Sequence, residues 1–133
     1  MTLNMAAPAP QSAGPLRVLL LGAMTSAYYE ASPEDQRERI LPRFKQLTEE
    51  WQALGAVPLA TLDDDLLMVG PPVSTGFTFY LFFEVERLDM VVAMIQRLRE
   101  EVDGVRMNMY ARFEARVGRP FFLIEPPADR IAE

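Results

Sequence analysis

One stretch of the chain, residues 105–118, carries most of the side chains whose types and spacing suit chemistry. Its odd positions from Val105 to Val117 are apolar, whereas its even positions are polar or aromatic. The even set is Arg106, Asn108, Tyr110, Arg112, Glu114 and Arg116. Because side chains alternate between the two faces of a strand, this spacing places the even set on one face. A guanidinium binds a carboxylate through two parallel hydrogen bonds, so the stretch predicts a face that can hold an acidic ligand.

A second strand pattern, residues 77–86, adds to this face, and its aromatic residues give it the strongest strand propensity in the chain. Its odd set (Phe77, Phe79, Leu81, Phe83 and Val85) is apolar, and its even set is Thr78, Tyr80, Phe82, Glu84 and Glu86. The ligand-binding candidates are Arg106, Asn108 and Arg112 for a carboxylate, and Tyr80 for an aromatic ring. The catalytic candidates are Glu84 and Glu114, as proton acceptors if burial raises their pKa, and Tyr110 as a hydrogen-bonding phenol. Two alternatives stay open: a salt-bridge network between two protomers without a ligand, and a face that simply meets water.

Two further clusters have the residue types of a site. Tyr28, Tyr29 and Glu30 lie in an expected loop after the first strand, where a tyrosine can orient a substrate oxygen and Glu30 can act as a base. Alternatively, the rings cap the core and Glu30 is solvated. The acidic run 63–65 (Asp63, Asp64 and Asp65) has carboxylates that suit Mg²⁺ or Ca²⁺. Its spacing matches no metal loop, so we expect no metal, and instead a bulge or a partner for Arg106 or Arg112.

Composition excludes several kinds of chemistry. The 133 residues include no cysteine and no histidine, and the net charge is −6. Disulfide and thiolate chemistry are therefore excluded, and the usual neutral-pH base and the usual zinc or haem ligand are absent. An acidic chain without a basic run is a poor candidate for nucleic acid or an anionic membrane surface. Because the sequence has no glycine-rich phosphate loop, we expect no nucleotide cofactor, and we expect no other cofactor either. Because it has no secretory signal and no apolar run long enough to span a membrane, we expect a cytoplasmic location.

The elements that must position these residues follow from patterns along the chain. Residues 1–15 are expected to be a disordered leader, 16–126 a single domain, and 127–133 a flexible tail. The apolar run 16–24 predicts a strand covered on both faces. Residues 25–31 are expected to be a loop, before a helix that begins at Ser32 and Pro33 and ends at Gly55. Its predicted buried stripe is Ile40, Phe44, Leu47, Trp51 and Leu54, with a kink or break near 40–42 because Pro42 lacks an N–H.

The second half of the chain repeats this order. Segments 56–62 and 66–70 are expected to form one strand with a bulge or two short strands, with a loop at 70–76 before strand 77–86. A second helix follows, with a predicted apolar face of Leu88, Val91, Val92, Ile95, Leu98 and Val102. Strand 105–117 and a short final strand, 118–126, complete the domain.

The order β-α-β-β-α-β with an extra C-terminal strand predicts an α+β, ferredoxin-like fold. Because each crossover is right-handed, both helices should cover the same face of one antiparallel sheet. The other face, which carries the even sets of 77–86 and 105–117, should then be bare in a single chain. Arg, Tyr and Phe are enriched where a surface is buried against a partner, so this face also suits a homodimer.

Residues 16–125 resemble the dimeric α+β barrel superfamily in their element order, polar inner sheet face and extra C-terminal strand. Members of that superfamily include muconolactone-isomerase-like enzymes, cofactor-free quinone-forming monooxygenases, EthD-like proteins and haem-handling enzymes. The stretch "MVVAMIQRLREEVDGVRMNMYARFEARVGRPFFL" is also similar, more weakly, to small bacterial IacB-type proteins that accompany gene clusters for indole-3-acetate breakdown. The resemblance implies a homodimer with a pocket for a small aromatic or cyclic acid. Haem chemistry does not fit, because haem-handling members place a histidine in the pocket.

Two functions therefore remain. The first is a cofactor-independent protein that binds or converts a small aromatic or cyclic acid, in aromatic catabolism of the indole-3-acetate type. The second is a non-catalytic dimeric accessory or structural protein whose polar sheet face is only a dimer interface. The sequence alone does not choose between an enzyme and a binding protein.

Overall fold

The computed structural model describes residues 15–70 and 76–125, so most of the predicted leader, part of the 70–76 loop and the predicted tail lie outside the described residues. The domain is of the α+β class, with a four-stranded antiparallel sheet in the order β2-β3-β1-β6. The strands are β1 (Leu16–Met24), β2 (Val57–Asp63), β3 (Phe79–Val85) and β6 (Ala111–Gly118). β1 lies in the middle and pairs with both β3 and β6.

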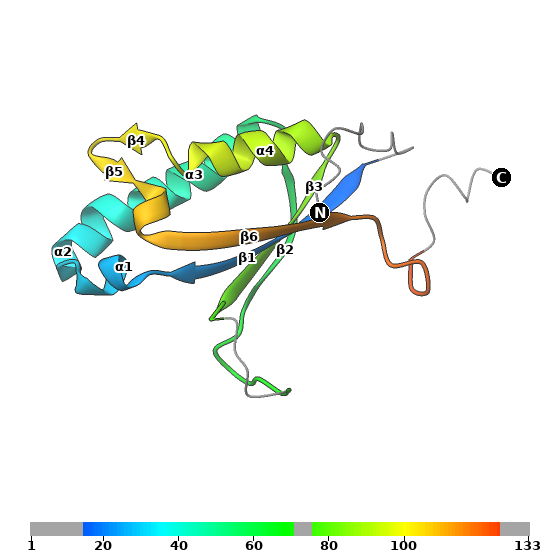
Figure 1. Ribbon diagram of the computed structural model, residues 1–133, viewed down its shortest axis with the longest axis horizontal. Helices are drawn as coiled ribbons and strands as arrows, with labels where there is room; N and C mark the ends of the chain where they lie inside the picture. Colours follow the sequence, from blue (N-terminus) through cyan, green and yellow to red (C-terminus); the bar gives the residue numbers. More distant parts are fainter. Residues whose placement is uncertain (1–14, 71–75, 126–133) are drawn as a thin grey trace, which may run out of the picture.

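The helices lie between the strands in sequence and on one side of the sheet in space (Figure 1). Between β1 and β2 come α1 (Ser26–Glu30), α2 (Pro33–Asp35), the π-helix η1 (Gln36–Ile40) and α3 (Leu41–Ala53). Between β3 and β6 come α4 (Leu88–Arg97), the small hairpin of β4 (Glu101–Val102) and β5 (Val105–Arg106), and the 3-10 helix η2 (Met107–Met109).

The start and the irregularity of the long helical segment follow the predicted signals. The Ser32 hydroxyl accepts a hydrogen bond from the Asp35 amide, and Pro33 occupies the first turn. Pro42 has no N–H to donate to the carbonyl four residues back, and the turn before it widens, so that the Leu41 amide donates to the Gln36 carbonyl. The predicted break is thus a single π-turn. The helix ends at Ala53, with Leu54 as its C-cap, and is stopped by Gly55, whose φ of 112° only glycine adopts readily.

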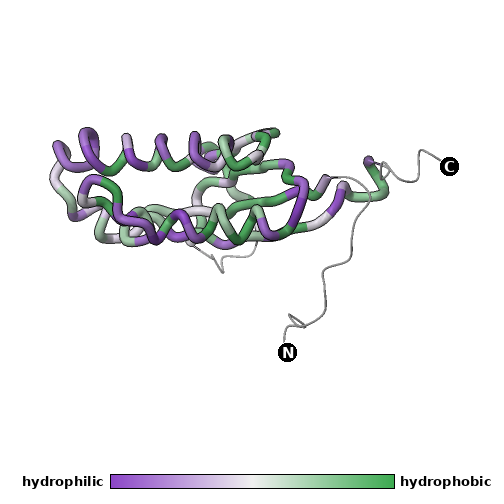
Figure 2. The backbone as a smooth tube through the Cα atoms, turned by 90° about the horizontal axis from the view of Figure 1, so that it is seen from above, coloured by the Kyte–Doolittle hydropathy of each residue, from purple (hydrophilic) through white to green (hydrophobic). Residues whose placement is uncertain are grey.

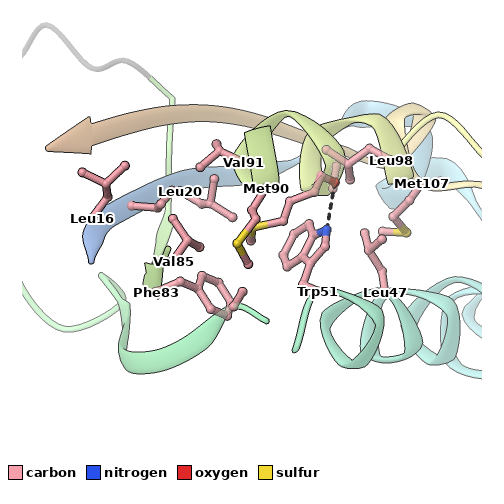
Figure 3. Packing of buried hydrophobic residues seen from close by; sticks show 14 of the residues in the cluster. Leu16, Leu20, Leu47, Trp51, Phe83, Val85, Met90, Val91, Leu98 and Met107 are labelled. Carbon is pink, nitrogen blue, oxygen red and sulfur yellow. Dashed lines mark hydrogen bonds between the residues drawn. The ribbon is translucent and has the colours of Figure 1, made fainter. Parts of the chain in front are cut away.

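The core fills the space between the sheet and the helices. Leu16, Val18 and Leu20 point from β1 toward the helices and are buried, as are Ile40, Leu47 and Trp51 of the first helical segment. Figure 3 shows Trp51 between the sheet and α4, where its indole Nε1 donates a hydrogen bond of 2.8 Å to the Met94 carbonyl. The predicted stripe of this segment is confirmed, with Phe44 and Leu54 partly buried against the same cluster.

Aromatic rings fill one end of this core. The Phe113 ring packs edge-on against the rings of Phe44, Trp51 and Phe79, with centroids 5.7–5.9 Å apart. Gly22 of β1 lies under two of these rings, and a Cβ there would come within 2.4 Å of Phe79 and 2.8 Å of Phe113. The rings therefore require a residue without a side chain at that point of the central strand.

The predicted apolar face of α4 is correct in part: Val91 and Leu98 are buried, and Ile95 packs partly buried against the core. Met90, Val91 and Met94 are the buried residues of α4, whereas Leu88 and Val92 are exposed. Both faces carry apolar residues, so periodicity left the rotation open, and packing against Trp51 selected the methionine side. Figure 2 shows hydrophilic and hydrophobic segments alternating along both long helices.

Three other predictions are wrong about strands and loops. Residues 26–30 form α1, not a loop. The 66–70 segment is exposed and forms no strand, because β3 already pairs with 57–63. The predicted bulge is also displaced: the register shift in β2 falls between Pro58 and Ala60, not at the acidic run. β1 is fully covered on one face only: on the other face Ala23 is buried, but Arg17, Leu19 and Leu21 are half-buried.

The last two corrections concern the C-terminal third. The predicted strand 105–117 is interrupted: Val105 and Arg106 pair with β4 in a separate hairpin, and η2 separates them from β6. The predicted final strand 118–126 does not form in the described residues, because β1 is already paired on both edges and the chain turns at 121–125. The amides of Ile124 and Glu125 both donate to the Phe121 carbonyl and close that turn.

Replacing Trp51 by Phe should lower the free energy of unfolding by about 2–4 kcal/mol. The substitution removes buried volume and leaves the Met94 carbonyl without its donor. Urea unfolding followed by far-ultraviolet circular dichroism measures the change. Val92→Ala, on the exposed side of α4, is the control and should change stability by less than about 0.5 kcal/mol. Equal effects of the two substitutions would contradict this packing.

Candidate ligand site on the open sheet face

The sheet face that the helices leave open is built from three strands in register. On this face Arg17 of β1 is paired with Glu84 of β3. The next residue of β1 on the face, Leu19, lies between Phe82 and Arg116, and Leu21 lies between Tyr80 and Glu114. The strands thus place two leucines in the middle, aromatic rings along β3 and charges along β6.

Four of the nine predicted site residues lie on this open face: Tyr80, Glu84, Arg112 and Glu114. Arg112 and Glu84 are at opposite ends of the face, since they are paired with Ala23 and Arg17 of β1. Arg106 and Asn108 do not, because they belong to β5 and η2; Arg106 instead lies 3.6 Å from Glu101. Tyr110 follows η2 and packs partly buried against the core. The interruption of the strand by η2 at 107–109 therefore separates the even residues of 105–118, which strict alternation predicted to lie on one face.

The predicted tyrosine pair lies on α1. Tyr28 packs against the core cluster, whereas Tyr29 is exposed, and the two rings meet edge-on with centroids 5.3 Å apart. The Tyr28 carbonyl accepts a hydrogen bond from the Gln36 side chain. For Tyr28, the geometry matches the alternative in which a ring caps the core.

At one end of the open face, aromatic and charged groups cover the sheet. The Arg112 guanidinium lies over the Phe77 ring, 4.3 Å from its centroid, and Arg112 is paired with Ala23 of β1. Phe77 and Ala23 are buried but do not belong to the core cluster under the helices. The prediction that Phe77 lies under the helices is therefore wrong: the strand begins at Phe79, and alternation does not extend to residue 77.

The acidic run contributes one hydrogen bond to this end. The Tyr80 hydroxyl donates to Asp64 Oδ2 at 2.9 Å, and this bond raises the pKa of Tyr80, with smaller contributions from burial and from the Asp64 charge. Among the described residues, no group of three or more acidic side chains is arranged to hold a metal ion. Asp64 thus serves to fix a phenol of the open face.

At the other end, the open face is hollowed into a shallow groove of about 370 Å³. Its floor is apolar, with Leu19 and Phe82 of the sheet, and Phe121 lines it from the segment after β6. Arg17, Arg116 and Glu125 also line the groove. The two guanidiniums come from neighbouring strands, and the apolar side chains between them are large enough to contact a ring. This is the arrangement that a small acid with an apolar body needs.

Arg17 binds Glu125 through both of its terminal nitrogens. The Nη1–Oε1 distance is 2.5 Å and the Nη2–Oε2 distance is 2.9 Å. These hydrogen bonds hold the pKa of the Glu125 carboxyl below its usual value and raise the pKa of Arg17. Because the carboxyl pKa is lowered, the contact is present at neutral pH and is lost as the pH falls through that lowered pKa.

Sequence reasoning missed the groove because its residues come from distant positions. Arg17 and Glu125 are 108 residues apart. Arg17 is the only charge in the apolar strand "LRVLLLGAM", and that isolation was the available signal. Arg116 belongs to the alternating set of 105–118 but is not among the predicted site residues.

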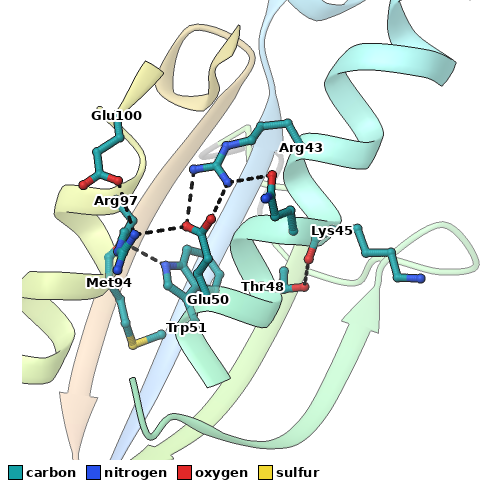
Figure 4. A network of polar contacts seen from close by, with 9 residues as sticks. Arg43, Lys45, Thr48, Glu50, Trp51, Met94, Arg97 and Glu100 are labelled. Atoms are coloured by element: carbon teal, nitrogen blue, oxygen red, sulfur yellow. Dashed lines mark hydrogen bonds and ion pairs between the residues drawn. The ribbon is translucent and has the colours of Figure 1, made fainter. Parts of the chain in front are cut away.

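A second cavity, of about 250 Å³, lies beside η1 and the β4–β5 hairpin and is lined by Arg39, Arg43 and Asp103 among others. Figure 4 shows why the buried Arg43 is a structural group: its Nη1 binds Glu50 at 2.8 Å, and Glu50 also lies 3.5 Å from Arg97. Only 4 % of Arg43 is exposed, so the carboxylate of Glu50 balances a charge that the fold has removed from water.

Comparison with known proteins gives no family for this chain: no family model, curated protein or solved structure matches it. Within residues 15–70 and 76–125, no helix has both the length and the apolar character that a membrane span requires.

Tyr80 should ionise at higher pH than an ordinary tyrosine, because deprotonation breaks its bond to Asp64. The stabilisation that this bond gives is present below the ordinary tyrosine pKa of about 10 and is lost as the pH rises through the raised value. Ultraviolet titration of phenolate absorbance in the wild type and Tyr80→Phe isolates the Tyr80 component. Asp64→Asn should move that component to lower pH, and an unchanged curve would contradict the bond.

Proposed function

We propose that this protein binds a small aromatic or cyclic carboxylic acid in the groove of the open sheet face, without a metal or nucleotide cofactor. The observation that carries the proposal is the pairing of an apolar floor, Leu19 and Phe82, with the guanidiniums of Arg17 and Arg116 in the lining of the groove. A guanidinium holds a carboxylate through parallel hydrogen bonds, and the floor takes the ring. This chemistry supports a role in the breakdown of aromatic acids, including those of the indole-3-acetate type.

The sheet topology supports a ferredoxin-like subunit. β3 pairs antiparallel with both β1 and β2, so β1 and β2 are parallel with β3 between them. By the same reasoning β3 and β6 are parallel with β1 between them. Two parallel pairs, each split by a strand of the other pair, correspond to the interleaved βαβ units of that fold.

We further propose that two copies stack their open faces, as in a dimeric α+β barrel, and enclose the groove. Phe82 in the middle of the face is 39 % exposed, and Leu62 on the neighbouring β2 is 58 % exposed. A stable dimer buries roughly 1,600 Å² in total, which a face of this kind can supply. Enclosure would remove the groove from water and strengthen its contacts with a charged ligand.

Two carboxylates of the face suit a role in converting the ligand. Glu84 is paired with Arg17, beside the groove, and Glu114 is paired with Leu21. A carboxylate on a face that a second copy encloses lies where it can accept a proton from the bound acid. The reaction class that these groups support begins with abstraction of a proton from a carbon of the bound acid. Return of that proton to another carbon gives an isomerisation, and reaction of the resulting carbanion with molecular oxygen as the oxidant gives an oxygenation.

A second candidate is a dimeric accessory protein that binds no acid. The observation in its favour is the amount of exposed apolar surface outside the groove: Val57 on β2 and all four residues from Leu66 to Val69 are exposed. A partner surface explains these side chains, whereas a ligand in the groove does not contact them.

A thermal-shift series with benzoate, salicylate and indole-3-acetate tests acid binding. At 100 times its dissociation constant, a bound acid should stabilise the protein by about 2.7 kcal/mol. Arg116→Ala should weaken binding about 10-fold to 100-fold, because a hydrogen bond to a charged group contributes about 1.5–3 kcal/mol. Arg99→Ala, at an exposed position after α4, should bind like the wild type. A protein that responds to none of the three acids would favour the accessory role.

Light scattering after size-exclusion chromatography tests the dimer. The wild type should have twice the mass of one chain, and Phe82→Asp should be monomeric because it places a charge in the middle of the stacked faces. Val92→Asp makes the same change at an exposed apolar residue of α4 and should remain dimeric. A wild-type monomer, or dimers for both variants, would rule out stacking through the open face.

A further inference from the structure

The last described residues of the chain, Arg119–Glu125, form a segment that we call the C-terminal latch. It turns back toward the start of β1, and Figure 2 shows it as a largely hydrophobic stretch where the C-terminal trace leaves the domain. Phe121 and Glu125 of the latch line the groove together with Arg17. The latch therefore forms one wall of the candidate site.

The latch is not held in place by burial. Its apolar residues, Phe121 to Ile124, are 58–80 % exposed. Within the described residues, the hydrogen bonds that join the latch to the rest of the chain are the two between Arg17 and Glu125. The other two bonds of the latch, to the Phe121 carbonyl, are internal to its turn. In the part of the chain that the structure describes, this ion pair is thus the polar contact that holds the latch to β1.

This ion pair has the geometry that a bound acid would adopt. The Glu125 carboxylate accepts from both terminal nitrogens of Arg17, as a ligand carboxylate does in a forked guanidinium pair. The two residues line the groove, with Leu19 and Phe82 on its floor. A free carboxylic acid with its ring on this floor would need the same two donors.

We infer that Arg17 is the anchor for the carboxylate of the ligand, and that Glu125 is an internal carboxylate that occupies this anchor until an acid displaces it. This inference rests on the proposed function and adds its regulation. Displacement is feasible because the side chains of Arg17 and Glu125 are 33 % and 49 % exposed, and an ion pair so open to water is weak. The incoming acid also buries its ring on the floor, which Glu125 cannot do.

Charge around the anchor is consistent with exchange of one carboxylate for another. Glu84 is paired with Arg17 on the open face, and Arg116 lines the same groove. When an acid replaces Glu125, the net charge at Arg17 is unchanged, so the field of Glu84 does not select between the two carboxylates. Selection then depends on the apolar body of the ligand.

The test measures the affinity of the full-length chain for benzoate, salicylate and indole-3-acetate by titration calorimetry. Glu125→Gln weakens the internal competitor, so at least one acid should bind roughly 2-fold to 6-fold more tightly than to the wild type. The gain is modest because only the open fraction of the protein binds the acid, and an exposed ion pair favours the closed state only a few-fold. Arg17→Ala should lose binding. Glu101→Gln, which alters another exposed ion pair at Arg106, is the matched control and should bind like the wild type.

Hydrogen exchange followed by mass spectrometry gives the second readout. Saturating acid should increase deuterium uptake across 119–125 in the wild type, and Glu125→Gln should show that increase without ligand. If Arg17→Ala abolishes binding while Glu125→Gln binds no more tightly than the wild type, the latch is wrong and the proposed acid site stands. If no acid binds to any variant, both the latch and the proposed function are wrong.

Discussion

The packing of α3 and α4 against a single face of the sheet is the constraint on which the other features of this protein depend. Trp51 lies at the centre of that packing, between the strands and α4, with its indole nitrogen bonded to the Met94 carbonyl. In the part of the chain that the structure describes, the helices and the small hairpin cover one face of the sheet. The second face of β1, with Leu19 and Leu21, is therefore left half-buried although the strand is apolar on both faces.

This one-sided cover explains why the edges and the open face carry different residues. β2 is an edge strand that is exposed throughout, and it contains Pro58 and a register shift, both of which discourage pairing with another strand. β6, at the opposite edge, carries Arg112, Glu114 and Arg116. The apolar residues of the open face thus lie between two protected edges, which favours contact with a ligand or a partner across the face and disfavours extension of the sheet.

Two arginine–glutamate pairs illustrate how burial decides the role of the same chemistry. Arg43 and Glu50 lie on the same helix, and Arg43 is almost completely buried, so that loss of either partner would leave a charge without compensation in the fold. Arg17 and Glu125 join the two ends of the described chain at the surface of a groove. Water can replace either partner there, and the pair can therefore open without disturbing the core.

The sequence by itself determined the elements whose signals are local. The Ser32–Pro33 helix start, the irregular turn before Pro42, the buried stripe from Ile40 to Trp51 and the helix end at Gly55 all follow from capping, proline chemistry and periodicity within a few residues. The polar alternation of β3 and of the second half of the 105–118 stretch was also readable, because a period of two requires no knowledge of the partner strand.

Only the tertiary structure decided which of those polar residues lie on the same face of the sheet. Alternation continues through Met107–Met109, but the chain leaves the sheet there because Val105 and Arg106 pair with β4, and this separates Arg106 and Asn108 from Arg112. The groove depends on strand register and on a contact between Arg17 and Glu125 across almost the whole described chain. Such long-range pairing has no local signal, since it follows from which strands become neighbours once one face of the sheet is buried.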